Sequence, residues 1–519
     1  MIDYTLVDWG FVLAALGALL LIAYRRPRKG LPLPPGPKGL PLIGNALDIP
    51  MTNGRTVFRE MSAKYGDVMY LNALGQPMIV LGSHEAAVDL LEKRGSNYSD
   101  RMSFVMSELC DMNWVLTMQH YGPYWRKHRR ALHEFLNPTV LDNYRADSRR
   151  DAHRFILNLM EEPHRLLHHS RGVFGAMIMR ISYGIELTER NWKYVDIAEA
   201  GIHAFTHALV PGKYLVESFP VLRRLPAWAP GAGFKREARA WRKDVRRALE
   251  EAWDETMEKH ARGAAPRSLA TVLHERAALL PDPAENAAEE EVAKNASAVT
   301  YAAGADTTIS TVQWFFFAMA AHPEAQARAQ AELDAVVGPG RLPEVEDQAE
   351  LPYVNALLKE CLRFRSVVPL GIPHRSLEDD EYRGYLIPKG SMIIANIWCV
   401  AFSRDPEVYP DPEAFRPERF LKNGRLNPEV RDPAAIAFGY GRRVCPGKAF
   451  AERSLFSIVS TALHTLSISA RIGEDGKPVP MAGEMTEGVL SYPEPFDCVI
   501  KPRSSATERL VRASCGAHA

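Results

Sequence analysis

The spacing of hydrophobic positions divides the chain into an apolar N-terminal run, two β-rich patches and a long helical region. Alternating patterns predict strands over Asp67–Leu81, with a turn at Gly75-Gln76-Pro77, and over Tyr382–Asn396. Helical periodicity dominates from about residue 84 to 365. The predicted helices cover Pro123–Phe135, Phe234–Arg262, Glu289–Ala321, Pro323–Val336, Leu351–Phe364 and about Pro446–Thr465. The pattern therefore predicts a mainly α fold with a smaller β part.

No internal repeat and no linker-like break divides the body of the 519-residue chain. We therefore expect four parts. Residues 1–29 form a membrane anchor with a basic stop, and residues 30–50 form a proline-rich hinge that acts as a stiff spacer. Residues 51–500 form one large globular domain. Residues 501–519, which are small and polar, form a disordered tail.

The run from Leu6 to Tyr24 predicts a single transmembrane helix. Its 19 residues span about 28 Å at 1.5 Å per residue, enough for a bilayer core. Four basic residues follow at once and place that end in the cytosol. A cleaved signal peptide would carry its charges before the apolar run, and a buried core helix does not usually end in four basic residues. An uncleaved anchor fits better than either.

Charge and cysteine content exclude several classes of function. The 63 basic and 63 acidic residues cancel, so nothing pulls the chain toward nucleic acid. The six cysteines are scattered without a CxxC pair, which argues against a disulfide framework and against a zinc site. This pattern is typical of a domain in the reducing cytosol.

The strongest chemical signal is the segment from Phe438 to Gly447, which holds Cys445 between glycines. Pro446 suits the first position of the predicted helix, so Cys445 should precede a helix N-terminus. Unpaired N–H groups and the helix dipole would then favour its thiolate. Haem iron in oxygen-cleaving enzymes uses such a thiolate. Gly441 and Gly447 would let the backbone approach a flat macrocycle. On Cys445 alone, a buried structural cysteine remains the alternative.

A second signal lies in the middle of the predicted helix Glu289–Ala321, where four small residues precede Asp306-Thr307-Thr308. Gly304 costs about 1 kcal/mol there relative to alanine, so a gain should offset it. Thr307 can bond a carbonyl one turn back, and Asp306 can relay protons from water. A notch for helix–helix packing with a self-bonded threonine is the alternative.

Together these segments resemble the cytochrome P-450 family, whose FxxGxRxCxG motif is matched at every fixed position from Phe438 to Gly447. The resemblance extends over about residues 30–500 and implies a cytochrome P-450 fold with haem b bound to Cys445. It implies that Asp306 and Thr307 deliver protons for O–O cleavage. The other haem contacts it implies, the propionate partners among them, are Trp125, Arg129, Gly304, His374, Phe438 and Arg443, with Arg101 a further candidate.

Glu360 and Arg363 stand three apart, on one face of a predicted helix. Surface pairs at this spacing are common and weak. The resemblance gives this pair a third member, Arg419, and implies a buried cluster that serves folding and haem retention.

The resemblance implies a monooxygenase that takes electrons from NADPH through cytochrome P-450 reductase, with cytochrome b5 as a further electron donor. It implies a single-pass protein of the endoplasmic reticulum with its catalytic domain in the cytosol. The pattern looks closest to fungal enzymes of secondary metabolism, which suggests a lipophilic terpenoid, polyketide or indole substrate. A haem-thiolate isomerase or lyase without a reductase, and a non-catalytic haem module, are the alternatives.

The segments expected to line the substrate pocket are mostly apolar, which suits a lipophilic ligand. Plain core packing is the alternative for each of these residues. They are Phe104, Val105, Met106, Trp114, Val115, Leu116, Val367, Val368, Leu370, Ile372, Val489 and Leu490. The apolar, proline-broken segment of residues 210–230 is expected to form a lid that dips into the membrane.

Overall fold

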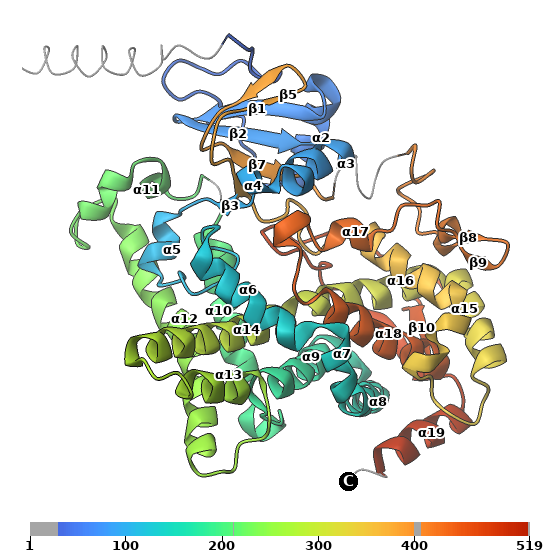
Figure 1. The fold of residues 1–519 in the computed structure, drawn as a ribbon. Coiled ribbons are helices and arrows are strands. Elements are labelled where there is room, and N and C mark those ends of the chain that lie inside the picture. Colours follow the sequence, from blue (N-terminus) through green and yellow to red (C-terminus); the bar gives the residue numbers. More distant parts are fainter. Residues whose placement is uncertain (1–29, 211, 399–405, 517–519) are drawn as a thin grey trace, which may run out of the picture.

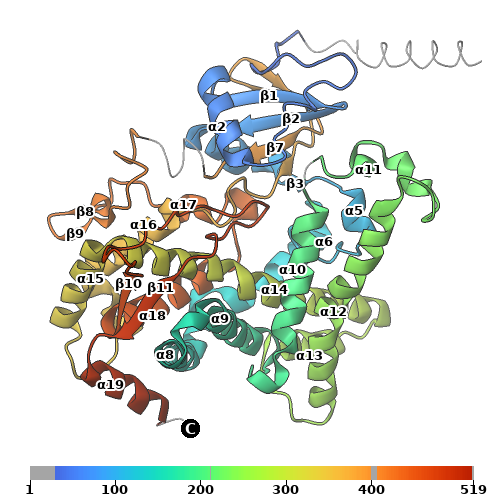
Figure 2. The same ribbon diagram turned by 180° about the vertical axis from the view of Figure 1, so that it is seen from behind.

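The computed structural model describes residues 30–210, 212–398 and 406–516. A small sheet-rich region lies at one end of the molecule and a larger mass of helices at the other (Figures 1 and 2). The prediction of a mainly α fold with a smaller β part is confirmed. The predicted anchor, residues 1–29, lies outside the described residues. Among the residues described, no helix is both long and apolar enough to cross a bilayer.

The main sheet has five strands in the order β1-β2-β7-β4-β3. The two patches with alternating patterns supply most of it, as β1 and β2 form an antiparallel hairpin and β2 pairs in parallel with β7. β4 and β3 extend the sheet toward the helices. The strands are β1 Val68–Ala73, β2 Gln76–Leu81, β3 Asp100–Arg101, β4 His374–Arg375 and β7 Met392–Ala395.

Three two-stranded sheets complete the β part, each an antiparallel pair. They are β5 Asp380–Tyr382 with β6 Tyr385–Ile387, β8 Leu421–Lys422 with β9 Arg425–Leu426, and β10 Leu466–Ala470 with β11 Cys498–Pro502.

The helical part is organised around the 39-residue helix α14, Pro283–Ala321, which runs through its centre (Figure 1). α14 packs against α6, α9, α12 and α13 and is buried on most of its faces. The other helices are α2 Gly54–Tyr65, α3 His84–Ala87, α4 Gly95–Tyr98, α5 Val105–Leu109, α6 Pro123–Leu136, α7 Pro138–Leu141, α8 Arg145–Glu161, α9 Leu166–Tyr183, α10 Lys193–Ala208, α11 Leu215–Ser218, α12 Gly233–Ala261, α13 Leu269–Ala278, α15 Pro323–Val336, α16 Pro352–Phe364, α17 Ala434–Ala437, α18 Lys448–Thr465 and α19 Ser505–Gly516.

Short π and 3-10 turns link these helices. They are η1 Val88–Lys93, η2 Asp142–Tyr144, η3 Pro163–Arg165, η4 Glu189–Asn191, η5 Pro220–Arg224, η6 Val345–Glu350, η7 Pro417–Phe420 and η8 Gly441–Arg443.

Capping explains where the predicted helix boundaries hold and where they move. α15 has the predicted bounds, and Pro323 occupies its first turn, where a missing N–H costs nothing. α14 begins six residues before the predicted Glu289, because Pro283 follows Asp282, whose side chain accepts the N–H of Ala284 at 2.9 Å. That cap starts the helix before its apolar periodicity begins.

Residues 501–516 form the end of a strand and a helix, which corrects the expectation of disorder for that part of residues 501–519; residues 517–519 lie outside the described residues. β11 extends to Pro502 and α19 follows, its start stabilised by the Ser504 hydroxyl, which accepts the N–H of Thr507 at 3.1 Å. Val511 and Cys515, four residues apart, are buried as α19 packs on α8. This short apolar stripe stabilises a helix that the polar composition concealed.

Candidate active site

A cavity of about 370 Å³ lies between the helical part and the sheet region. α14 lines one wall, and the loop that carries Cys445 lines another. Further lining comes from α6 and α10, from residues 112–117 and from residues 367–374. Among the residues described, no aspartate or glutamate lines this cavity, whereas four arginines do. The cavity is therefore a positively charged, largely apolar chamber.

The loop between α17 and α18 presents Cys445 to the cavity. The backbone N–H of Cys445 donates to the carbonyl of Phe438 at 2.8 Å, which closes the loop on itself. α18 begins at Lys448 behind Gly447, so Pro446 lies in the turn before the helix and not in its first position. This start corrects the predicted helix boundary by two residues.

The thiol pKa is set by opposing effects. Burial in the protein interior raises the pKa of Cys445, while a hydrogen bond from the Gly447 backbone and the charges of Arg129 and Lys448 lower it. Burial is the largest of these effects, and the thiolate at a helix start stays a prediction. A bound cation lowers the pKa of a coordinating thiol far more than a helix terminus does.

Glycine is present at two positions of the motif, 441 and 447, for different structural reasons. Gly441 has a φ of +52°, and a Cβ there would collide with the backbone of Leu91 in η1. It does not line the cavity, so close packing against η1 explains it and not approach to a macrocycle. Gly447 does line the cavity, and a Cβ there would lie 3.7 Å from the Cys445 sulfur.

The wall formed by α14 contains Ala303, Gly304 and Thr307. The Thr307 hydroxyl donates to the Ala303 carbonyl at 2.9 Å, as expected for a threonine bonded one turn back. A Cβ on Gly304 would approach Ile178 of α9 to 2.7 Å. The helix-packing alternative therefore explains the glycine, although the residue also borders the cavity.

Asp306 lies on another face of α14 from Thr307 and does not line the cavity. Its buried carboxyl accepts a hydrogen bond from the Tyr492 hydroxyl. Burial raises the pKa of Asp306, although the bond from Tyr492 and the nearby Arg171 oppose this rise. Of the two predicted proton-delivery residues, the structure thus brings only Thr307 to the cavity wall.

The predicted partners of the haem propionates gather at one rim of the cavity. Trp125, Arg129, His374 and Arg443 all line it, together with Arg101. The guanidinium of Arg443 lies 4.4 Å from the centre of the Trp125 ring. Burial lowers the pKa of Arg443 to about 10 and lowers the pKa of His374. Several buried cations near one another are costly without an anion.

Some of these donors bond the protein itself. The Arg443 guanidinium donates to the carbonyls of Ser99 and Gln119 at 2.7 and 2.8 Å, and His374 Nδ1 bonds the carbonyl of Tyr98 at 2.7 Å. They therefore also fasten the segment before α6. By contrast, Trp125 Nε1 is buried with no hydrogen-bond partner among the residues described.

These residues fit a haem. The cysteine sulfur faces the chamber, the rim offers an unpartnered buried N–H and clustered guanidinium groups, and no carboxylate lines the walls of the described cavity. A macrocycle with two carboxylates would meet the cationic rim and leave the apolar walls to its ring. Cys445 would hold the iron, and Trp125, Arg129, His374, Arg443 and Arg101 would face the propionates. Phe438 and Gly304 would border the ring.

Glu360, Arg363 and Arg419 form one buried cluster, as the resemblance implied. The Arg363 guanidinium donates to both carboxylate oxygens of Glu360, at 2.7 and 2.8 Å, and Arg419 Nε reaches the carboxylate at 3.2 Å. Both arginines also donate to the Ala414 carbonyl. The cluster thus joins α16 to η7 and to the preceding loop.

The apolar lining agrees in part with the predicted pocket. Phe104, Val105, Met106, Leu370 and Val489 do not line the cavity, and the first four pack into hydrophobic clusters. α10 and α12 contribute residues that the sequence did not indicate: Gly201, Ile202, Phe205, Val245 and Ala248. The confirmed lining residues are Trp114, Val115, Leu116, Val367, Val368, Ile372 and Leu490.

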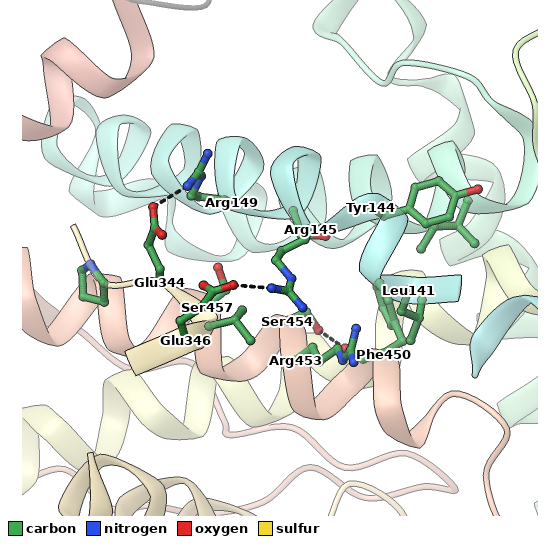
Figure 3. A pocket seen from close by; sticks show the side chains of 14 residues that line it. Leu141, Tyr144, Arg145, Arg149, Glu344, Glu346, Phe450, Arg453, Ser454 and Ser457 are labelled. Atoms are coloured by element: carbon green, nitrogen blue, oxygen red, sulfur yellow. Dashed lines mark hydrogen bonds and ion pairs between the residues drawn. The ribbon is translucent and has the colours of Figure 1, made fainter. Parts of the chain in front are cut away.

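A second, smaller pocket of about 50 Å³ lies between α8, η6 and α18 (Figure 3). Its arginines are already paired: Arg145 with Glu346, Arg149 with Glu344, and Arg453 with Asp142. Because its charges are satisfied internally and its volume is small, it is a poor site for a substrate.

Comparison with known proteins agrees with this geometry. The family model described as Cytochrome P-450 matches residues 34–498. The chain is 44% identical to cytochrome P-450 monooxygenase COX1 of Coprinopsis cinerea, over 92% of both chains. It is 37% identical to tryptamine 4-monooxygenase of Psilocybe cyanescens, over 97% of this chain and 99% of that protein. This chain therefore belongs to the cytochrome P-450 family and is one of its monooxygenases, an oxidoreductase that binds haem.

Proposed function

We propose that the protein inserts one atom of dioxygen into a lipophilic small molecule of fungal secondary metabolism, by hydroxylation or epoxidation. The observation that carries the proposal is one chamber that joins the Cys445 sulfur, the Thr307 face of α14 and an apolar lining. A terpenoid, polyketide or indole would suit that lining. The similarity to a tryptamine 4-monooxygenase supports the indole class among these.

The haem would supply oxygen activation when bound. Cys445 would hold it from one side and the cationic rim would hold its carboxylates, while Val367, Ile372 and Leu490 would orient an apolar substrate. Thr307, at the cavity wall, would donate protons from its hydroxyl. Asp306 would supply new protons to that hydroxyl. In balance, one oxygen atom enters the substrate, and the other leaves as water with two electrons and two protons.

The two electrons would come from NADPH through cytochrome P-450 reductase, with cytochrome b5 as a further donor. Support comes from exposed basic residues near the Cys445 loop. Arg126 of α6 and Arg442 of η8 lie 5.8 and 5.3 Å from the centre of the same Tyr121 ring, so both belong to one surface. A basic surface there suits an acidic partner.

We propose a location on the cytosolic face of the endoplasmic reticulum membrane, with residues 1–29 as a single-pass anchor. Large apolar side chains are exposed on two neighbouring segments, and a Cβ on Gly212 would lie 3.2 Å from the Met51 sulfur. Trp228 and Leu42 are 82% and 78% exposed. Such a patch is typical of a membrane contact. Its members are Leu40, Leu42, Leu47, Met51, Leu215, Phe219, Val221 and Trp228.

The full-length protein, expressed in microsomes with a fungal reductase, provides the test. Candidate terpenoids, polyketides and indoles are supplied with NADPH under labelled dioxygen, and products are analysed by mass. We expect NADPH consumption and products that carry one labelled oxygen atom. Rearranged products without NADPH consumption would instead indicate a haem-thiolate isomerase or lyase.

A further inference from the structure

Tyr492 is the residue that contacts Asp306, and it belongs to a loop far away in sequence. Its hydroxyl donates to the Asp306 carboxyl, across 186 positions of the chain. The loop that carries Tyr492 also carries Leu490, which lines the cavity. One short segment therefore contacts both the substrate chamber and the acid on the neighbouring face of α14.

This loop is held rigidly. The Ser310 hydroxyl, one turn after Asp306 on α14, donates to the Ser491 carbonyl at 2.6 Å. The backbone N–H and carbonyl of Tyr492 both bond Thr486, at 2.9 and 2.8 Å. The Ser310 bond thus ties the loop to α14, and the Thr486 bonds hold the backbone of Tyr492 within the loop, as precise placement of a partner side chain requires.

The surroundings of Tyr492 and Asp306 lead toward solvent. Arg171 of α9 and Glu199 of α10 form an ion pair in which each side chain is about one-third exposed. The charge of Arg171 acts on both Asp306 and Tyr492, and the charge of Asp306 acts on Glu199. Asp306 therefore lies between a solvent-facing polar pair on one side and the Thr307 wall of the cavity on the other.

We propose that Tyr492 is a positioning residue for proton delivery: its hydroxyl holds the Asp306 carboxyl on the solvent-facing side of α14, beside Arg171 and Glu199. From there the carboxyl takes up a proton and passes it toward Thr307. The inference deepens the proposed monooxygenase function and rests on it. A purely structural role, in which Tyr492 only satisfies a buried carboxyl, is the competing explanation.

Tyr492→Phe provides the test because it removes the hydroxyl and keeps the ring. Tyr353→Phe is the matched control, since the Tyr353 hydroxyl donates to the Glu418 carboxyl at 2.8 Å away from the cavity. The readouts are product per NADPH consumed, hydrogen peroxide released, and the solvent isotope effect on NADPH oxidation. We expect Tyr492→Phe to lower product per NADPH about fivefold, the factor expected for one lost hydrogen bond. Tyr353→Phe should leave it unchanged.

A double-variant cycle separates positioning from structure. If Tyr492 acts through Asp306, Tyr492→Phe should cause no further loss of coupling in an Asp306→Asn background. An equal loss in both backgrounds, or the same loss in Tyr353→Phe, would overturn the proposal. Unchanged coupling in Tyr492→Phe would also overturn it.

A spectroscopic readout is independent of turnover. The infrared band of the Asp306 carboxyl, identified by its absence from Asp306→Asn, should shift in Tyr492→Phe. Its pH midpoint should move upward, because the hydrogen bond from Tyr492 favours the carboxylate. An unmoved band contradicts the positioning role. If the unmodified protein consumes no NADPH with any substrate, the monooxygenase proposal fails. The infrared band then still shows whether Tyr492 holds the Asp306 carboxyl.

Discussion

The carboxylate of Glu217 accepts the backbone N–H of Met106 at 2.8 Å, across 111 positions of the chain. Its second oxygen accepts the N–H of Val105 at the same distance. These are two of the unpaired donors at the start of α5. Glu217 lies in α11, which follows α10 and precedes α12 in the chain. The helices α11 and α5 lie side by side in both ribbon views (Figures 1 and 2). This contact thus links two segments beside the cavity.

Loss of this link should loosen α5, which contacts the cavity-lining helices α10 and α12. Glu217→Ala leaves two N–H groups unpaired, and we expect faster hydrogen exchange over α5 and faster ligand association and dissociation. The stability cost should be about 1 kcal/mol, as for a lost helix cap. Glu332→Ala is the matched control, since Glu332 accepts the N–H groups of Tyr353 and Val354 away from the cavity. Equal ligand kinetics in both variants would contradict the link.

Removal of the iron ligand should abolish the spectrum of thiolate-bound haem. Cys445→Ala is expected to lack the characteristic absorption band of the reduced, carbon monoxide-bound protein, because no other cysteine lines the described cavity. Cys498→Ala, which alters a half-buried cysteine of β11, should retain the band. Persistence of the band in Cys445→Ala would exclude Cys445 as the ligand.

Thr307→Ala should retain that band while electrons are diverted from product to hydrogen peroxide. A positioned proton donor typically contributes a factor of 10² or more, so product per NADPH should fall by about tenfold or more. Thr461→Ala on α18 removes a similar hydroxyl, which donates to the Ser457 carbonyl at 2.7 Å away from the cavity. Unchanged coupling in Thr307→Ala would show that its hydroxyl only bonds Ala303.

Gly304→Ala tests whether close packing of α14 on α9 requires the glycine. Alanine favours the helix by about 1 kcal/mol, but its Cβ would lie 2.7 Å from Ile178, and overpacking costs about 1–3 kcal/mol. We expect a lower urea midpoint, restored in part by adding Ile178→Ala. A higher midpoint in Gly304→Ala alone would show that the helix preference prevails.

The pH dependence of stability should report on Asp306. Burial raises its pKa in the folded protein above that of the unfolded chain, so the fold favours the protonated carboxyl. Stability is therefore lost as pH rises from the unfolded pKa, about 3.9, through the higher folded pKa. The urea midpoint of Asp306→Asn, relative to that of the unmodified protein, should therefore increase as pH rises through that window and stay constant above it. A constant difference at every pH would contradict the raised pKa.

Local patterns predicted the parts of this molecule that depend on near neighbours. The hairpin of β1 and β2, the helix α15 and the loop around Cys445 each follow from residues a few positions apart. The cationic rim was identified through resemblance, because Trp125, His374 and Arg443 are spread over more than 300 residues and no local pattern links them.

The features that sequence reasoning missed depend on tertiary contacts. The Tyr492–Asp306 bond joins a loop to the distant helix α14, and the Glu217 link joins the short helix α11 to the start of α5. No periodic pattern in the sequence indicates either contact. At Gly304 the sequence left helix packing as an alternative to haem contact, because Ile178, its neighbour across the helix interface, cannot be identified from the sequence. The order of α19 was missed because two apolar residues suffice once α8 offers them a surface.

The parallel pairing of β2 with β7 determines how late in synthesis the main sheet can form. Met78–Leu81 pairs with Met392–Ala395, more than 300 positions later. During synthesis, the hairpin formed by the first two strands must wait with an open, apolar edge until three-quarters of the polypeptide has emerged from the ribosome. Nascent chains interrupted before that point should be the forms most prone to aggregate and most dependent on chaperones.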